Sequence, residues 1–520
     1  MDIFVRKHQN KINGSLGCFD RMLFRGYLPI QSGWAMAQFL NQNKISFRHL
    51  KDFLIENAGK INQHAKTLAT KFGRPFQYQT VPTRKEDLAR KMAEEEGIKR
   101  GLICVFSVLE PCRTFSFRFE KGRPFVQSAR RKCLFLYFYF MDREFGLIHV
   151  KLQTWFPMQM QVYVNGHDWL ARKLTANGIS FTKQDNAFLR VDNWERAQKL
   201  ADRFTGLNWP RMLERYARYV NPLLKNLLQG YQHYWVTAQS EYSTDIIFKS
   251  SSDLRELFPR LLSHSTLCFG AKDVMSFLGR KLTGHFGGEI ISDMKDGGWR
   301  RRLPGARIKH RVKENWLKMY DKAGSVLRVE MVINNPEEFK VRKKVTRKNK
   351  QVMEWVSMRK GVAYLFRYQE VSQQANYRYL EALAVVDDPT LAIHQLDEIT
   401  TRKKTAAGRG VRAFNPLSRD DILLFKAMMA GQHHIRGLSN ADIRTCLEDS
   451  PHLRDLTHDL KKQSARVSRI LSRFHAHKLI AKIPRTRRWR VTGRGKQIMA
   501  ASLCLRDVAF PELFRKNAAA

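Results

Sequence analysis

Three strand-like segments in the middle of the chain carry residue types that can bind a metal ion or act as a nucleophile. The segment "STDIIF" contains Asp245, "KMYDK" contains Tyr320 and "LRVE" contains Glu330. Carboxylate oxygens are the ligands that Mg²⁺ and Mn²⁺ prefer, and a tyrosine hydroxyl can form covalent intermediates. These three residues are therefore the first candidates for a chemical site.

The order of these segments resembles that in rolling-circle replication initiators. In that family a strand with Tyr-Asp-Lys precedes a strand with Arg-hydrophobic-Glu, and another strand carries Asp between hydrophobic residues. The resemblance implies that Asp245 and Glu330 hold Mg²⁺ or Mn²⁺ and that the Tyr320 hydroxyl attacks a phosphodiester, so that all three are catalytic. It further implies that the same site is faced by Asp321, Lys322 and Arg328.

The chain departs from this family where the family holds its metal. The family places two histidines one residue apart on a strand, whereas His475 and His477 fall in a predicted helix. In the predicted strand around His149, Lys151 stands where the second histidine would be. A second resemblance, to RNase H-like nucleases, starts from the hairpin predicted for residues 133–155 and implies two metal ions held by Asp142, Asp245 and Glu330. Asp142 falls at the predicted turn, where Asp is favoured in any case.

Basic residues mark the C-terminal part, residues 417–505, where we expect helix, helix, helix, hairpin and helix. Ser418 and Thr492 are the expected N-caps of the first and last helices. This order resembles winged-helix proteins of the MarR-like kind, in which the third helix enters the major groove of duplex DNA and the hairpin touches the minor groove or the phosphates. The resemblance implies DNA contacts by Lys461, Lys462, Gln463, Arg466, Arg469 and Arg473 of the helix and by Arg485, Arg487, Arg488 and Arg490 of the hairpin.

The net charge of the chain predicts a polyanionic partner. There are 92 Lys and Arg against 48 Asp and Glu, a net charge of +44. Such a surplus opposes compaction unless a polyanion neutralises it, so we expect nucleic acid, either DNA or RNA. The run "KVRKKVTRKNK" adds expected phosphate contacts by Arg342, Lys343, Lys344, Arg347 and Lys348.

Several other classes are disfavoured. The chain has no run of 18 apolar residues, no lipidation motif and no apolar signal segment at its start, so we expect a cytoplasmic protein without a membrane partner. It has no GxxxxGK[ST], GxGxxG, HExxH or GxSxG motif, which disfavours ATP-driven and dinucleotide chemistry. The seven scattered cysteines indicate neither a disulfide framework nor a zinc ribbon.

The elements that position these residues predict an α+β multidomain fold, with mixed or antiparallel sheets and flanking helices. Residues 1–94 are expected to be helical, with a turn at "GSLGCFD" (14–20). Residues 95–235 are expected to form an α+β domain with an aromatic hairpin, and 236–386 a second one containing three antiparallel strands. A basic linker (387–416), the winged-helix domain (417–505) and a tail (506–520) follow. No long internal repeat is visible in the sequence.

Two functions fit these expectations. In the first, the protein binds nucleic acid: the C-terminal domain docks on duplex DNA, and the α+β body holds single-stranded or structured nucleic acid. Bases would stack on a face formed by Tyr137, Tyr139, His149, Lys151, Gln153 and Trp155. The alternative is a metal-dependent nuclease or nickase of a mobile or replicating element. A transcription regulator is a weaker third, because about 400 residues precede the C-terminal domain.

Overall fold

The computed structural model describes residues 2–515 except 121–122, 285, 297–305, 348–349, 387–395, 406–407, 432, 434–436, 457–458 and 512–513. The chain forms two compact units. Unit 1 comprises Met1–Phe258 and Met275–Leu380, and unit 2 comprises Pro259–Val274 and Glu381–Ala520. The expected α+β class is confirmed, because unit 1 is a large mixed sheet with flanking helices.

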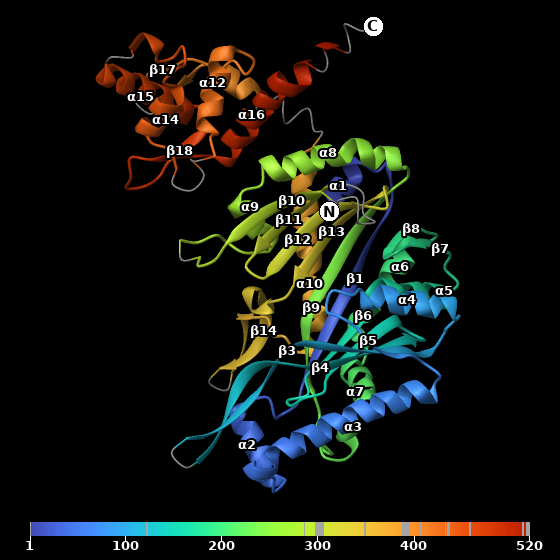
Figure 1. The fold of residues 1–520 in the computed structure, drawn as a ribbon. Coiled ribbons are helices and arrows are strands. Elements are labelled where there is room, and N and C mark those ends of the chain that lie inside the picture. Colours follow the sequence, from blue (N-terminus) through green and yellow to red (C-terminus); the bar gives the residue numbers. More distant parts are fainter. Residues whose placement is uncertain are drawn as a thin grey trace. The chain divides into compact units, whose positions relative to one another are not determined.

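One eleven-stranded sheet organises unit 1 (Figure 1). Its strand order is β10-β11-β12-β13-β9-β1-β6-β5-β4-β3-β2. Neighbouring strands are antiparallel except for β2 and β3, which are parallel. The strands are β1 (Ile12–Tyr27), β2 (Phe76–Tyr78), β3 (Gly101–Glu120), β4 (Arg123–Asp142), β5 (Gly146–Gln153), β6 (Met160–Asn165), β9 (Tyr234–Phe248), β10 (Ile290–Asp296), β11 (Ala306–Val312), β12 (Asn315–Lys322) and β13 (Val326–Ile333).

The two halves of this sheet share an order in which one long strand is followed by two helices and then by four strands. In the first half, β1 is followed by α2 (Gly33–Gln42) and α3 (Leu50–Lys71), then by β2 and α4 (Lys85–Glu95), and then by β3 to β6, of which β6 returns to pair with β1. In the second half, β9 is followed by α8 (Ser251–Leu267) and α9 (Ala271–Phe277), and then by β10 to β13, of which β13 returns to pair with β9. β1 and β9 pair with each other and join the halves. The repeat is therefore one of element order rather than of sequence.

The sheet crosses the domain boundaries expected at residues 94 and 235, because strands from all three N-terminal regions pair in it. The expected turn at residues 14–20 is wrong, since this segment lies within β1. A Cβ on Gly14 would lie 2.3 Å from the indole nitrogen of Trp194, and one on Gly17 would lie 2.5 Å from the Tyr242 hydroxyl. These glycines therefore allow close packing against β1 instead of forming a turn.

The remaining helices of unit 1 cover the sheet. On β9, the side chains of Glu241 and Asp245 point to one face and those of Tyr242 and Thr244 to the other, because neighbours on a strand alternate. Asn376 of α10 donates its amide to the carbonyl of Tyr242 and to the hydroxyl of Thr244, both at 3.1 Å, so α10 covers the second face. The helices of unit 1 that cover the sheet are α4 (Lys85–Glu95), α5 (Gly166–Ala176), α6 (Trp194–Asp202), α7 (Trp209–Val220) and α10 (Leu365–Leu383).

Three small hairpins and a short N-terminal helix are among the further regular elements described before residue 417. The helix is α1 (Asp2–Lys7), and the hairpins are β7–β8 (Phe181–Gln184 with Ala187–Val191), β14–β15 (Lys340–Arg347 with Lys350–Ser357) and β16–β17 (Lys403–Lys404 with Gly410–Val411). The last of these lies in the expected basic linker, of which residues 387–395 and 406–407 are outside the described part. Among the described residues, no helix is both long and apolar enough to cross a membrane.

The elements of unit 2 after residue 417 follow the expected order. They are α12 (Arg419–Met428), α14 (Asn440–Leu447), α15 (Leu460–Ala476), the hairpin β18–β19 (Ile480–Lys482 with Trp489–Val491) and α16 (Gly493–Cys504). Ser418 caps α12 by accepting the N–H of Asp421, and Thr492 caps α16 by accepting the N–H of Gly495. Phe425, Val467 and other buried side chains of these helices form one apolar core.

Candidate metal centre

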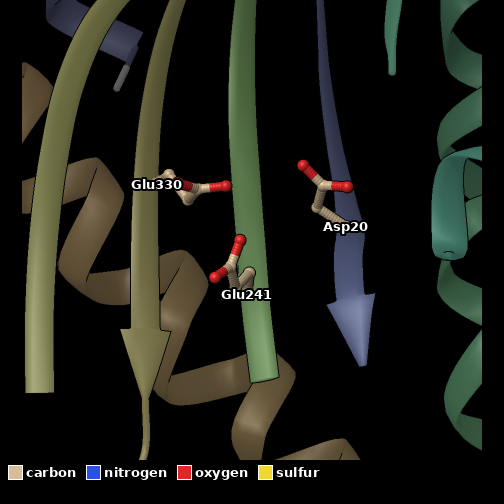
Figure 2. A group of neighbouring side chains, drawn as sticks. All are labelled: Asp20, Glu241 and Glu330. Atoms are coloured by element: carbon tan, nitrogen blue, oxygen red, sulfur yellow. The ribbon is translucent and has the colours of Figure 1, made fainter. Parts of the chain in front are cut away.

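Three acidic side chains from three adjacent strands converge near the middle of the sheet (Figure 2). Asp20 lies on β1, Glu241 on β9 and Glu330 on β13. Each offers a carboxylate oxygen, and the three oxygens lie within 4.8 Å of one another. All three residues are buried, and Glu241, at 8% exposed, is the most accessible of them. This acidic cluster is brought together by the pairing of β9 with β1 on one side and with β13 on the other.

Asp20 is held in place by hydrogen bonds to both of its oxygens. Asn165 and Arg328 donate to it at 3.0 and 3.1 Å, and the amide of Asn186 also donates to it. The Nδ1 atom of His167 lies 3.6 Å from it. Burial raises the pKa of Asp20, but His167 and Arg328 outweigh burial, so the pKa of this carboxyl lies below its usual value. Asp20 is therefore an ionised and well-oriented ligand candidate.

Asp245 forms an ion pair instead of joining the acidic cluster. Its two oxygens accept from Nε and Nη2 of Arg328, both at 2.7 Å. Asp245 is 1% exposed and Arg328 is fully buried. Such a bidentate pair occupies both carboxylate oxygens. On this geometry, the candidate metal ligands are Asp20, Glu241 and Glu330, and Asp245, which the sequence suggested, is not among them.

Lys318 brings a second positive charge to the cluster. It lies directly across from Glu330 in the register of β12 and β13 and donates to Oε2 of Glu330 at 2.8 Å. Its Nζ atom lies 4.0 Å from Oε1 of Glu241. Burial lowers the pKa of Lys318, but Glu330 and Glu241 raise it by more, so Lys318 stays protonated.

The charges of this site suit a divalent cation. The acidic cluster and Asp245 supply four carboxylates, whereas Lys318 and Arg328 supply two positive charges within ion-pair distance of them. Burial and the charge of Glu330 raise the pKa of Glu241 to about 8, so this carboxyl holds a proton at pH 7 when no metal is bound. A divalent cation would replace that proton and balance the surplus of negative charge. A set of oxygen ligands favours Mg²⁺ or Mn²⁺.

Tyr320 lies on the same face of β12 as Lys318, because the two are two residues apart. It is partly exposed and lies directly across from Arg328. Burial and the charge of Glu330 raise the pKa of Tyr320. Lys322 also lies on this face, with Nζ 3.8 Å from Asp185.

Asp321 is the one residue of the replication-initiator pattern that does not face the site. Its carboxylate accepts the N–H of Gly324 at 3.0 Å and thereby caps the turn between β12 and β13. Asp142, suggested by the RNase H-like resemblance, also caps a turn, because it accepts the N–H groups of Glu144 and Phe145. Asp142 is therefore a turn residue and not a member of the acidic cluster.

Sequence reasoning did not find Asp20 or Glu241. Asp20 was hidden because its segment contains two glycines and resembles a turn. Glu241 could have been found, since it precedes Asp245 by four residues in a strand-like segment and must therefore share its face.

The basic residues expected to contact DNA divide into two groups. Lys461, Lys462, Arg469, Arg485, Arg487 and Arg490 are exposed, and Arg466 and Arg488 are partly exposed. In contrast, Gln463 is 7% exposed and donates to the carbonyl of Leu456 at 3.0 Å. Arg473 pairs with Asp421 at 2.8 Å and lies 3.8 Å from the centroid of the Phe414 ring. Gln463 and Arg473 therefore hold unit 2 together, which corrects their expected place on its outer face.

The phosphate contacts expected from the basic run at residues 340–350 fall only partly within the described chain. Arg342, Lys343 and Lys344 are exposed on β14, and Lys343 donates to the Tyr364 hydroxyl at 2.8 Å. The side chain of Arg347 and all of Lys348 lie outside the described part of the chain.

The two tyrosines of the aromatic hairpin lie in the core and do not form a stacking face. Tyr137 and Tyr139 are 8% and 2% exposed and pack in one apolar cluster with Ala89 of α4. Lys151, also expected on the stacking face, forms an ion pair with Glu110, and Gln153 is fully buried. Of the six suggested residues, His149, Lys151 and Trp155 are partly exposed.

His149 predicts a loss of stability in acid. Its ring stacks on Tyr163 at 5.0 Å, and burial, with Arg21 and Lys151, lowers its pKa to about 3. Because the unfolded chain binds this proton near pH 6.5, stability falls as the pH drops below that value, by at most about 1.4 kcal/mol per pH unit. His149→Phe is expected to flatten this slope in urea unfolding between about pH 7 and pH 5. An equal slope in both proteins would contradict the assignment, and His49→Gln, at an exposed histidine, is the control.

Comparisons with known proteins identify no family. No family model matches the chain, and no curated protein or solved structure matches it. A function is therefore inferred from the side chains of the acidic cluster and the charge of the chain.

Proposed function

We propose that this protein binds nucleic acid and cleaves phosphodiester bonds with a divalent metal ion held by Asp20, Glu241 and Glu330. The observation that carries the proposal is the convergence of three buried carboxylates in a chain of net charge +44. Burying surplus negative charge is costly unless a cation accompanies it. The basic surface would attract the phosphate backbone, and the acidic cluster would hold the metal.

The side chains of the site have separate tasks in this proposal. A bound Mg²⁺ or Mn²⁺ would polarise a phosphate oxygen as a Lewis acid. Arg328 orients Asp20, and Lys318 places a positive charge beside the cluster, where negative charge develops in the transition state. Tyr320 brings a hydroxyl to the same face. Burial and the charge of Glu330 raise the pKa of Tyr320, so neutralising Glu330 would remove the second cause and favour the nucleophilic, deprotonated hydroxyl.

A denaturing-gel assay tests the proposed cleavage. Labelled single- and double-stranded DNA and RNA are incubated with the protein and Mg²⁺ or Mn²⁺, with EDTA as the control. Discrete products that require the metal support the proposal. A protein–nucleic acid adduct that survives denaturation and is lost in Tyr320→Phe would identify Tyr320 as the nucleophile. Cleaved strands without such an adduct would indicate that water is the nucleophile. Uncut substrate in every case would contradict the proposal.

The C-terminal helices and hairpin are proposed to be the winged-helix part that docks on duplex DNA, with α15 in the major groove. Arg466→Ala combined with Arg469→Ala is then expected to weaken duplex binding by about 1–3 kcal/mol for each base that the helix no longer reads. Fluorescence anisotropy with a labelled duplex measures the change. Unchanged affinity would remove α15 from DNA recognition.

Arg473→Ala is the matched control for that prediction. Arg473 lies on the same helix but pairs with Asp421 and donates to the carbonyl of Ala413 at 2.6 Å. We therefore expect this variant to lower the thermal stability of unit 2. Its effect on the affinity of the folded protein is expected to be smaller than that of the Arg466 and Arg469 pair.

A second candidate is a nucleic-acid-binding protein that does not cleave. The observation in its favour is the ion pair of Lys318 with Glu330, which already supplies part of the positive charge that the acidic cluster needs. A native gel run beside the cleavage assay distinguishes the two candidate functions. The candidate that does not cleave predicts substrate that is shifted but uncut in the presence of Mg²⁺ and Mn²⁺.

A further inference from the structure

A cavity of about 700 Å³ lies between α3 and the β3–β4 ribbon of unit 1. Its volume is within the usual range for small-molecule sites. Aromatic rings form much of its wall: Phe47 and Phe117 lie with their centroids 6.1 Å apart at 76°, Phe115 lies 6.3 Å from Phe117, and Trp155 also lines the cavity. Phe47, Phe117 and Trp155 are partly exposed. None of these residues belongs to the acidic cluster or its partners.

Every charged residue that lines this cavity is a cation. Lys51 comes from α3, and Arg131 and Lys132 come from β4. All three are exposed, and none forms an ion pair with a residue in the described ranges. The positive charge continues along the same ribbon, where further exposed side chains are those of Arg113, Arg118 and Arg130. The cavity thus has aromatic walls and a cationic rim, and further cations extend from both faces of the same strand pair.

The glutamate on this part of the ribbon is already neutralised. Glu110 contacts Lys151 and accepts from the Tyr137 hydroxyl at 2.6 Å. It therefore does not cancel the charge of the three rim cations. These cations are available to an anion from outside the protein.

We infer that this cavity binds an unpaired base of single-stranded nucleic acid, with the adjoining phosphates running along the β3–β4 ribbon. The inference deepens the proposed function and rests on it, since it assumes a nucleic-acid partner. A base offers a flat apolar face to the aromatic rings, and the phosphates on either side of it meet the cations. Bases in a duplex are stacked and cannot enter, so the cavity would favour single strands over duplexes.

The base requirement is tested with two labelled strands that have the same number of phosphates. One is an oligothymidylate of about 12 nucleotides, and the other is an abasic strand of equal length. Trp155→Ala is expected to weaken binding of the oligothymidylate by about 10-fold, because base–aromatic stacking contributes that much, and to leave the abasic strand unaffected. Phe366→Ala, which removes an exposed aromatic ring on α10, is the control and should change neither affinity.

The phosphate contacts are tested by salt dependence. Replacing Arg131 and Lys132 with Ala is expected to reduce the slope of log K against log salt by about 0.7 for each cation that contacts a single strand. Arg196→Ala combined with Lys199→Ala, at two exposed residues of α6, is the control with a matched change of charge. An unchanged slope in the Arg131 and Lys132 variant would overturn the proposed path of the phosphates.

The outcomes separate this inference from the proposed function. If the wild-type protein binds no nucleic acid, both fail. If it binds the thymidylate and abasic strands equally, or if Trp155→Ala binds both like the wild type, the base cavity alone is refuted. Circular dichroism and thermal unfolding of each variant show whether a lost affinity comes from lost folding, and Trp155→Phe, which keeps a ring for stacking, is expected to restore most of the affinity.

Discussion

Glu241→Gln is expected to abolish metal-dependent cleavage while leaving the protein folded and able to bind nucleic acid. Glutamine resembles the protonated form of this carboxyl, which is the form present at pH 7 without metal because the pKa of Glu241 is about 8. The metal-free variant should therefore be at least as stable as the wild type at pH 7. Its affinity for Mn²⁺ should fall by at least about 100-fold, because the loss of a direct ligand should weaken binding at least as much as the loss of a residue that only hydrogen-bonds to a ligand.

The pH dependence of metal binding follows from the same pKa. Glu241 must lose its proton to act as a ligand, so the affinity of the wild type should rise with pH up to about 8 and then level off. Glu337→Gln, at an exposed glutamate outside the cluster, is the control and should behave like the wild type. Full cleavage by Glu241→Gln would show that the acidic cluster is structural.

Arg328→Met is expected to destabilise unit 1 by about 3–5 kcal/mol, because it leaves the carboxylates of Asp245 and Asp20 buried without their cation. Arg328 is fully buried and also donates to the carbonyl of Asn186 at 2.6 Å. Methionine has a similar length, so the loss reflects charge more than volume. Urea unfolding followed by circular dichroism measures the change.

The double variant Arg328→Met with Asp245→Leu tests the cause of that loss. Replacing both members of a buried ion pair with apolar residues removes the unpaired charge, so we expect it to recover a large part of the stability. A double variant as unstable as Arg328→Met alone would show that packing, and not the stranded carboxylate, dominates.

Local patterns predicted much of the fold. The three strands β11 to β13 and their turns follow from alternation and turn residues at 306–334, and the structure contains them. The caps Ser418 and Thr492 and the order of the C-terminal elements also follow from short-range signals. Glu330 was singled out because the Arg-hydrophobic-Glu pattern of its strand lies within one short segment.

The assembly of the site could not be predicted in the same way. Arg328 and Asp20 are 308 residues apart in the chain, and their contact depends on β9 lying between β1 and β13. Strand order across such separations is decided by packing of the whole sheet and not by any one segment. For the same reason, Asp245 was expected from the sequence to be a metal ligand, whereas both of its carboxylate oxygens accept from Arg328.

Calorimetric titration of the metal-free protein with Mn²⁺ at pH 7, in two buffers that differ in ionisation enthalpy, tests the central claim most directly. The acidic cluster predicts one ion bound per chain, with the release of about one proton because Glu241 is protonated beforehand. It also predicts that Asp20→Asn and Glu241→Gln each lose this binding. Absence of binding at millimolar Mn²⁺, or binding that both variants retain, would contradict the metal centre.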